Sequence, residues 1–405
     1  MSDIPPPPPG ESGWSGPRLS VVVPTFREAQ NIPLLVQGIR SVLEPAGWDY
    51  EIIIVDDNSA DGTEQACRDL AAAGHPLRLI VRAQERGLSS AVIRGLREAR
   101  GHLLACMDAD LSHPPEALPA MLECLTGQGA EFVIGSRYVS GASTDEHWGL
   151  LRYLNSKAAT LLARPFTRAR DPMAGFFAMP RAVFERASGL NPIGYKIGLE
   201  LIVKCDVRRL CEVPIHFSDR RFGQSKLGLR EQLNYLRHLK RLADYKYGAF
   251  SELAQFCLVG ATGTVVNLAL LALFRRMALP FWLASGLAIW LSMTSNFYLN
   301  RRLTFSFSRR HSPWMPYLRF VASCSIGATI NWGLAVGLVS GVGLFGRHEV
   351  LAQFLGIVAG TLFNFVLSRQ WVFKRLRPRH HSSADEAGRS ALSSAPSPSE
   401  SETRP

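Results

Sequence analysis

The stretch LLACMDADLSHPP (residues 103–115) runs from an apolar segment into two carboxylates, Asp108 and Asp110. If this segment is a strand, both carboxylates point to the same side, because side-chain direction repeats every second residue. Two carboxylates this close repel each other unless a cation lies between them. Mg²⁺ binds to a few carboxylates together with substrate phosphate oxygens. We therefore predict a metal–diphosphate site at the end of a buried strand; the alternative is a pair of solvated carboxylates in a turn.

Apolar segments of the same kind recur along the first half of the chain and alternate with helical segments. Strands are predicted at residues 19–23, 51–55, 77–81 and 131–135, in addition to the quoted stretch. Apolar strands that alternate with helices indicate an α/β fold with a parallel sheet covered on both faces. Ligands bind beyond the carboxyl ends of such strands, so we expect the polar segments there to converge on one edge. These segments are Pro24–Glu28, Asp56-Asp57, Arg86-Gly87 and Asp108–Asp110.

Length, charge and cysteine content narrow the class of protein. A chain of 405 residues exceeds the ~250–300 residues at which a single core stops growing, so more than one domain is expected. The net charge of +11 and the isoelectric point near 9.6 suit an anionic partner: nucleic acid, a phosphate-bearing substrate or an anionic membrane face. The seven cysteines include no C-x-x-C pair, which favours reduced thiols in a cytosolic domain.

The two ends of the chain have the composition of disordered tails. Residues 1–17 contain five consecutive prolines, and residues 376–405 are rich in Ser, Pro and Glu. The N-terminal tail has no apolar signal-peptide region, so we do not expect export of the domain that follows it.

The chemistry of the chain changes after residue 250. Four apolar segments lie near residues 253–274, 281–299, 317–339 and 350–368, and none carries a charged residue at mid-span. Each is long enough to cross a hydrocarbon core of ~30 Å, so we predict a four-helix transmembrane domain over residues 251–375; a soluble helical bundle is the alternative. Residues 227–250 combine spaced leucines with Arg and Lys, which is typical of amphipathic helices at a membrane interface.

The predicted membrane segments contain an internal repeat. The sequence Asn296-Phe297-x-Leu299-x-Arg301…Phe305 matches Asn364-Phe365-x-Leu367-x-Arg369…Phe373, and Phe256…Asn267 has the spacing of Phe320…Asn331. We infer two copies of a helical hairpin in the same orientation, related by an axis along the membrane normal. The repeated Asn residues are predicted to hydrogen-bond between helices, with a role in transport as the alternative.

The distribution of basic residues predicts the orientation in the membrane. Basic residues cluster between the second and third segments (Arg301, Arg302, Arg309, Arg310, Arg319) and after the fourth (Lys374, Arg375, Arg377, Arg379). The hairpin loops carry only Arg275, Arg276 and Arg347. By the positive-inside rule, we predict an integral membrane protein with both termini and the soluble domain in the cytoplasm.

Several longer motifs occur together in residues 18–226. They are Val-Pro-Thr-Phe-Arg-Glu (23–28), Ile-Val-Asp-Asp-Asn-Ser-x-Asp-Gly-Thr (54–63), Arg-Gly-Leu-Ser-Ser-Ala (86–91), Met-Asp-Ala-Asp-Leu-Ser-His-Pro-Pro (107–115), Gly-Ser-Arg-Tyr (135–138), Asp-Pro-x-x-Gly-Phe-Phe (171–177) and Asp-Arg-Arg-x-Gly-x-Ser-Lys (219–226). With these motifs the region resembles the dolichyl-phosphate (polyprenyl-phosphate) mannose synthases, inverting GT-A glycosyltransferases of family two with a Rossmann-like, mostly parallel sheet. Residues 251–375 resemble the GtrA-like four-helix membrane domain.

The resemblance implies roles for individual residues. Pro24, Phe26, Glu28, Val55 and Asp57 would hold the nucleotide. Asp108, Ala109 and Asp110 would lie at the diphosphate and at a metal ion, Mg²⁺ or Mn²⁺. Arg137, Lys196, Arg220 and Lys226 would contact phosphates of the donor or acceptor, and Arg137, Arg152 and Ser156 the lipid phosphate. Asp108, Asp110 and Arg137 would act in catalysis.

Two positions depart from the pattern of the family. Some relatives have Gln where this chain has Ser112, the third predicted metal ligand, so Ser112 or a water molecule would complete the ligand set. Phe26 and Arg27 stand where Tyr and Asn are common. Phe26 keeps the stacking face of the ring and loses the hydroxyl.

The implied reaction is the inverting transfer of mannose from GDP-mannose to dolichyl or polyprenyl phosphate, giving a β-linked lipid sugar and GDP. A lipid monophosphate, with a second pKa of about 6, is mostly ionised near neutral pH and needs no general base. One alternative is the same transfer from another donor, such as UDP-glucose to undecaprenyl phosphate. Another is a lipid-linked sugar flippase with a regulatory soluble domain. The implied partners include the lipid bilayer and no nucleic acid; the sequence leaves the oligomeric state open.

Overall fold

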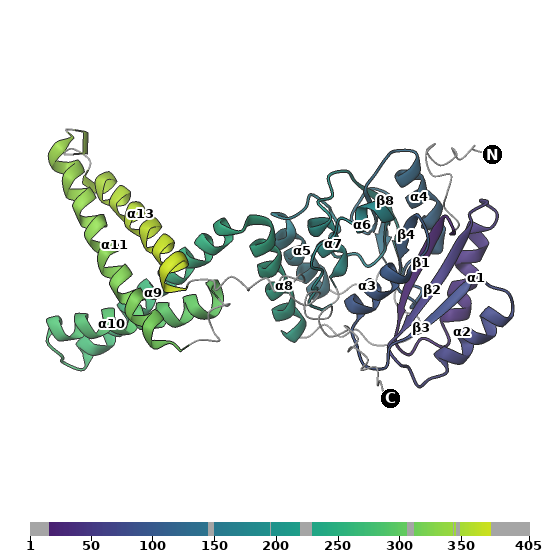
Figure 1. Ribbon diagram of the computed structural model, residues 1–405, viewed down its shortest axis with the longest axis horizontal. Helices are drawn as coiled ribbons and strands as arrows, with labels where there is room; N and C mark the ends of the chain where they lie inside the picture. Colours follow the sequence, from purple (N-terminus) through teal and green to yellow (C-terminus); the bar gives the residue numbers. More distant parts are fainter. Residues whose placement is uncertain are drawn as a thin grey trace, which may run out of the picture. The chain divides into compact units, whose positions relative to one another are not determined.

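The structure, a computed structural model, describes residues 16–144, 150–194, 196–218, 229–305, 312–342, 344–345 and 349–373. It divides into two compact units, Met1–Gly248 and Ala249–Pro405 (Figure 1). We call the first the sheet unit and the second the helical unit. The two predicted tails lie almost entirely outside the described residues.

The sheet unit contains a seven-stranded sheet in the order β3-β2-β1-β4-β7-β5-β8. Its strands are β1 (Leu19–Thr25), β2 (Tyr50–Asp56), β3 (Leu77–Val81), β4 (Leu103–Cys106), β5 (Phe132–Ser136), β7 (Phe177–Pro180) and β8 (Leu210–Pro214). β7 is antiparallel to both of its neighbours, and the other pairs are parallel. The predicted mostly parallel α/β sheet is therefore confirmed. A separate parallel pair joins β6 (Ser143–Thr144) and β9 (His216–Phe217).

Two strands of the seven-stranded sheet, β7 and β8, and the short pair β6 and β9 were not predicted from the sequence, and the end of β4 was predicted too late. β7 has only four residues, and most of β8 is half-buried, so neither forms a long apolar run. β4 ends at Cys106, so Asp108 and Asp110 lie in a turn beyond the strand. The alternation of side chains along a strand therefore does not set the direction of these carboxylates.

Both faces of the sheet are covered, because its strands are apolar on both sides. In β1, Val21 and Val23 belong to one core and Val22 to the other, as alternation along a strand requires. The first core includes residues of α1 (Ile32–Leu43), α2 (Thr63–Ala72) and α4 (Leu118–Thr126). The second includes residues of α3 (Leu88–Glu98), α6 (Arg181–Phe184) and α7 (Ile197–Lys204).

The strand order brings the predicted polar segments to one edge of the sheet. β1 to β4 run in the same direction, and Figure 1 shows β3, β2 and β1 side by side. β7 runs in the opposite direction and pairs its first residue, Phe177, with Cys106 at the end of β4. Residues 171–176, which precede β7, therefore reach the same edge, where Arg137 follows β5.

Helix α8 (Leu229–Tyr247) belongs to the sheet unit. Leu239 and Leu242 are buried in a cluster with residues of α7, whereas Leu233 and Leu236 are about half exposed. One apolar face of this helix thus packs on the sheet unit. A membrane-interface role for residues 227–250 stays a prediction.

The helical unit contains α9 (Ala249–Arg276), α10 (Phe281–Leu299), α11 (Trp314–Gly341) and α13 (Glu349–Leu367). α9 packs on α10 and α11 on α13, as expected for two hairpins. α10 and α13 each run into a π-helical turn at equivalent positions of the repeat, Asn300–Thr304 and Ser368–Val372. Within the described part of the chain, α9 is the helix that is long and apolar enough to cross a membrane. Four spans stay a prediction.

The two hairpins contact each other through reciprocal aromatic pairs. Phe256 of the first packs against Phe365 of the second with ring centroids 5.8 Å apart. Their repeat equivalents, Phe320 and Phe297, lie 5.6 Å apart. Reciprocal contacts of this kind define a two-fold interface, so the sequence repeat corresponds to a two-fold-like packing of the hairpins.

The repeated Asn residues of the hairpins press against glycines. Asn296 lies against Gly263 of α9, and Asn364 against Gly327 of α11, so closely that neither glycine has room for a Cβ. The Oδ1 atoms of both Asn side chains are buried and lack a hydrogen-bond partner among the described residues. These two oxygens therefore do not make the predicted bond between helices. The small residues instead let each pair of helices approach closely.

Candidate active site

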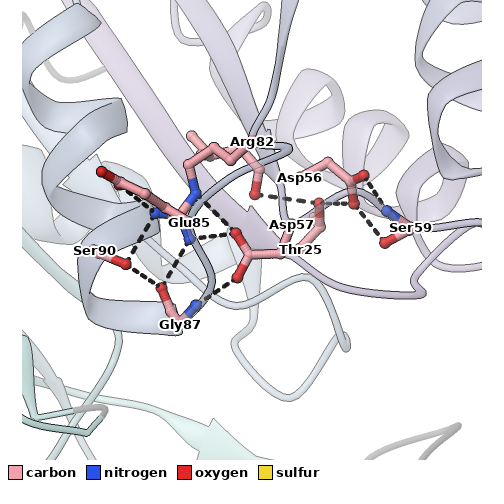
Figure 2. A network of polar contacts seen from close by, with 9 residues as sticks. Thr25, Asp56, Asp57, Ser59, Arg82, Glu85, Gly87 and Ser90 are labelled. Atoms are coloured by element: carbon pink, nitrogen blue, oxygen red, sulfur yellow. Dashed lines mark hydrogen bonds and ion pairs between the residues drawn. The ribbon is translucent and has the colours of Figure 1, made fainter.

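A buried ion pair holds the loop after β3. Asp57 accepts hydrogen bonds from Nε of Arg82 at 2.8 Å and from the backbone N–H of Gly87 at 2.7 Å (Figure 2). Arg82 also donates to Oγ of Ser90 at 2.9 Å. A buried pair is tolerated when further hydrogen bonds satisfy both groups, as they do here. Asp57, the carboxylate predicted to hold the nucleotide, thus organises this loop together with Arg82, a residue for which the sequence predicted no role.

Asp56 ties the end of β2 to the end of β1. Its carboxylate accepts the N–H of Ser59 at 2.7 Å, the hydroxyl of Ser59 at 2.6 Å and the hydroxyl of Thr25 at 3.1 Å (Figure 2). Oγ of Ser59 in turn accepts the backbone N–H of Arg27 at 2.7 Å. This network fixes the backbone on both sides of Phe26.

Phe26 presents an aromatic face at this edge of the sheet. Its side chain is 39% exposed, and the guanidinium carbons of Arg27 and Arg86 lie 5.2 and 5.7 Å from the ring centroid. An exposed ring can stack on a base, and the two cations beside it suit an attached phosphate. Of the other predicted nucleotide residues, Pro24 and Val55 are buried and in register on β1 and β2, and Glu28 accepts from Nδ2 of Asn31 at 2.6 Å.

The turn after β4 holds Asp108, Ala109 and Asp110. Asp110 is buried, and its Oδ1 accepts the N–H of Ser112 at 3.1 Å and the hydroxyl of Ser112 at 2.5 Å. The N–H of Asp108 donates to Nδ1 of His113 at 2.9 Å. Hydrogen bonds within the turn, and not strand alternation, therefore orient this segment.

The oxygen donors of this turn fit a hard divalent cation. Asp108 and Asp110 supply carboxylates, and Ser112 supplies a hydroxyl whose proton is donated to Asp110. Within the described residues, no three His, Cys, Asp or Glu side chains converge as a complete metal site. Mg²⁺ and Mn²⁺ favour oxygen ligands, and Mg²⁺ commonly takes its remaining ligands from water and substrate phosphates. A diphosphate would complete the site in this way.

His113 contacts Asp108 from the core of the sheet unit, although the sequence predicted no role for it in the site. Its buried ring stacks on Phe176 with centroids 5.3 Å apart and meets the edge of Phe217 at 5.8 Å. Burial lowers the pKa of His113, against the opposing charges of Asp108 and Asp110. The ring is therefore mostly neutral at neutral pH, which lets Nδ1 accept the N–H of Asp108.

Arg137 is held by a buried carboxylate. Its Nε donates to Oδ2 of Asp171 at 2.7 Å, and its Nη2 donates to Oδ1 at 2.8 Å. Asp171 is fully buried, and its Oδ2 also accepts the backbone N–H of Arg137 at 3.1 Å. Burial opposes the charge of Arg137, but the hydrogen bonds and charge of Asp171 outweigh it and raise the pKa of Arg137. The guanidinium is thus a permanent, oriented cation.

Lys196 completes a cluster of charges with Arg137, Asp171 and Asp108. It is half-buried at the start of α7. Burial and then the positive charge of Arg137 lower the pKa of Lys196 to about 8, although Asp171 and Asp108 act in the opposite direction. The structure thereby brings two of the predicted phosphate-binding cations to the predicted metal ligands.

The remaining predicted residues are described only in part. Oγ of Ser156, on α5 (Leu150–Ala163), shares a hydrogen bond of 2.6 Å with the hydroxyl of Tyr138, the neighbour of Arg137. The side chain of Arg152 lies outside the described residues, as do Arg220 and Lys226.

Comparison with known proteins identifies the class. The profile of the family "Glycosyl transferase family 2" matches residues 20–187, and that of "GtrA/DPMS, transmembrane domain" matches residues 255–373 and 334–395. A mostly parallel sheet with carboxylates and cations at one edge, followed by this membrane domain, defines a membrane-attached glycosyltransferase. The helical unit is accordingly part of a membrane protein.

Individual relatives narrow the class further. Dolichol-phosphate mannosyltransferase from Pyrococcus furiosus is 38% identical over 87% of this chain and 98% of its own length. The enzyme of the same name from Mycosarcoma maydis is 46% identical over 59% of this chain and 85% of its own. This chain therefore belongs to the dolichol-phosphate mannosyltransferase family. A crystal structure of glucosyl-3-phosphoglycerate synthase from Mycobacterium tuberculosis is also similar, at 20% identity and a TM-score of 0.41 over 57% of this chain and 80% of that one.

Proposed function

We propose that this protein transfers mannose from GDP-mannose to dolichyl or polyprenyl phosphate with inversion, releasing GDP. The observation that carries the proposal is the proximity of Asp108 to Arg137 and Lys196, at the sheet edge whose turn also carries Asp110, in a chain of this family. The reaction needs positive charge at this edge of the sheet, because two anions, a diphosphate and a lipid phosphate, must approach each other. Neither the transfer of another sugar nor flipping of a lipid-linked sugar is favoured by a specific observation.

The donor nucleotide would lie across the ends of β1, β2 and β3. Phe26 would stack on the base, and the exposed Arg27 and Arg86 beside it would bind the charged part of the donor. The Asp57–Arg82 pair would act indirectly, by holding the loop that ends at Gly87. Pro24, Glu28 and Val55 would shape the backbone around the nucleotide.

The diphosphate would lie at the turn after β4. Asp108, Asp110 and Ser112 would hold Mg²⁺ or Mn²⁺, which neutralises negative charge on a departing diphosphate when it is bound. Ser112 keeps Asp110 oriented, and His113 holds the backbone of Asp108. These protein groups keep the two carboxylates in place before the substrate arrives.

The acceptor phosphate would approach from the cationic side of the site. Because it is mostly ionised at neutral pH, it can attack the sugar carbon without a general base. Arg137 and Arg152 would neutralise and align it, and the hydroxyl of Ser156 would donate a hydrogen bond to it. Lys196, Arg220 and Lys226 would contact phosphates of the donor or the acceptor. A single displacement on an α-linked donor then gives the β-linked product.

We further propose that four helices span the membrane, with the sheet unit and both chain ends in the cytoplasm. The support is the excess of Arg and Lys on one side of the apolar segments. The site would then meet a donor dissolved in the cytoplasm and an acceptor whose phosphate stays near the lipid headgroups.

The test is incubation of the purified full-length protein with polyprenyl phosphate and a panel of sugar nucleotides. We expect lipid-linked mannose from GDP-mannose in excess over every other product, and dependence on added Mg²⁺ or Mn²⁺. A clear preference for UDP-glucose would overturn the proposed donor. Lipid-linked sugar transport without any transfer would overturn the proposed reaction.

The metal site can be tested with Asp110→Asn. We expect transfer to fall by at least about 100-fold, because the loss of several kcal/mol of charge stabilisation corresponds to two or more factors of ten in rate. Binding of Mn²⁺ to the variant, followed by its paramagnetic signal, should weaken in parallel. Asp206→Asn, at an exposed carboxylate paired with Arg208 outside the site, is the control. Wild-type transfer by Asp110→Asn would contradict the metal role.

A further inference from the structure

Glu212, on β8, holds the backbone that carries Asp171. Its Oε2 accepts the N–H of Arg170 at 2.8 Å, and its Oε1 accepts the N–H of Asp171 at 3.0 Å. Hydrogen bonds from N–H groups to a charged carboxylate are stronger than those between neutral groups. The bidentate contact therefore fixes both the position and the tilt of this loop.

Asp171 in turn orients Arg137 through two hydrogen bonds. The two side chains make a fork-to-fork contact, with both carboxylate oxygens occupied by guanidinium N–H groups at 2.7 and 2.8 Å. A planar guanidinium in such a contact has its plane set by the carboxylate. A shift of the Asp171 backbone therefore moves the cation that faces Asp108 and Lys196.

We propose that Glu212 is a positioning residue of the transfer reaction, which sets the orientation of the Arg137 guanidinium through Asp171. The inference rests on the proposed function. Glu212 lies on β8 beside β5, in register with Ile134, whereas Arg137 follows the end of β5. Its carboxylate is occupied by the two backbone N–H groups, so it acts through Arg137 and not on a substrate.

The chain contains a matched control in Glu131. Its Oε2 accepts the consecutive N–H groups of Arg208 and Arg209 at 2.8 and 3.2 Å, and its Oε1 accepts from Arg186 at 2.9 Å. Glu131 precedes β5 at its amino end, whereas Arg137 follows the carboxyl end. Glu131→Gln therefore weakens a similar contact between a carboxylate and two consecutive backbone N–H groups, and an ion pair with Arg186, at the opposite end of β5 from Arg137.

The experiment measures transfer by the full chain in detergent for the wild type, Glu212→Gln and Glu131→Gln, with Tm for each. Gln offers one acceptor oxygen and places an NH₂ donor against the second N–H, so one bond is lost. We expect Glu212→Gln to lower kcat by about 10- to 100-fold, the loss typical of hydrogen-bonded partners of metal ligands, with KM for the nucleotide sugar within about threefold. Glu131→Gln should lower Tm by at least as much, because it also loses the ion pair with Arg186, and should leave kcat within about threefold.

A double-mutant cycle then separates positioning from folding. Arg137→Lys keeps a cation for Asp171 but has no fork to orient. We therefore expect Glu212→Gln to change kcat by less than about threefold in the Arg137→Lys background. A full loss there, or an equal loss in Glu131→Gln, would overturn the proposal, because independent sites act additively.

The same assay distinguishes a failure of the proposed function from a failure of the proposed role of Glu212. If the wild type uses a donor other than GDP-mannose, the proposed donor fails and the comparison of variants is made with the donor it uses. If the wild type transfers no sugar from any donor, both proposals are overturned.

Discussion

The positive charge that Lys196 contributes to the site depends on pH near 8. With a pKa of about 8, it loses its proton as the pH rises through the range in which most lysines stay charged. We expect kcat/KM for the acceptor phosphate to fall above pH 8 in the wild type, because one of the cations that align the phosphate is lost. In Lys196→Arg, whose side chain does not titrate there, this fall should disappear.

The same shift has the opposite consequence for stability. Between pH 8 and the ordinary lysine value of 10.5, the folded protein binds fewer protons at Lys196 than the unfolded chain does. The free energy of unfolding contributed by this residue therefore rises with pH across that window. Transfer that falls while Tm relative to Lys196→Arg rises would identify this residue. Parallel losses of both would instead indicate general alkaline unfolding.

The substitution Arg152→Ala tests whether the acceptor phosphate and the sugar nucleotide are bound by different cations. An Arg can bind a phosphate through two parallel N–H bonds, whereas Ala leaves the anion unpaired. We predict that Arg152→Ala lowers transfer to polyprenyl phosphate by about 10-fold or more, while calorimetric affinity for the sugar nucleotide changes by less than about threefold. A collapse of donor affinity would assign Arg152 to the nucleotide. No change in either quantity would make it an ordinary surface cation.

At the scale of elements, the helical unit depends on close approach between paired helices. A Cβ on Gly360 of α13 would lie 2.6 Å from the backbone oxygen of Gly327 on α11, which cannot move independently. A Cβ on Gly333, also on α11, would meet no atom within 4 Å. Both glycines lie inside helices, but a Cβ would clash at Gly360 and would have free space at Gly333.

We predict that Gly360→Ala destabilises the helical unit by about 1–3 kcal/mol, the usual cost of overpacking. Gly333→Ala should be neutral or stabilise by up to about 1 kcal/mol, since Ala is the better helix former. Thermal unfolding of the full chain in detergent measures both. Equal effects of the two substitutions would mean that α11 and α13 do not approach each other as closely as this.

At the scale of the whole molecule, the orientation of the chain decides which substrates the site can reach. We predict that a cytoplasm-dependent reporter fused after Lys374 is active and that the same reporter inserted after Met277, in the first hairpin loop, is inactive. The reason is the clustering of Arg and Lys on one side of the apolar segments. An active reporter at both positions would overturn the hairpin topology.

The local pattern of residues was sufficient for much of this protein. It predicted the five strands that carry the site, because apolar runs that end in polar residues report both burial and chain direction. It also predicted the two-hairpin repeat, which follows from spacing along the chain, but it extended β4 through Asp108 and Asp110, which lie in a turn beyond the strand. The motifs also pointed to the family that the relatives confirm.

Tertiary structure alone decided how the site is held together. β7 inserts between β4 and β5 in the opposite direction, which brings residues 171–176 to the carboxylates. Asp171 meets Arg137 from 34 residues away and Glu212 from 41 residues away. Such contacts depend on strand order and register, which periodicity along the chain does not encode because it reports only which side of an element is buried.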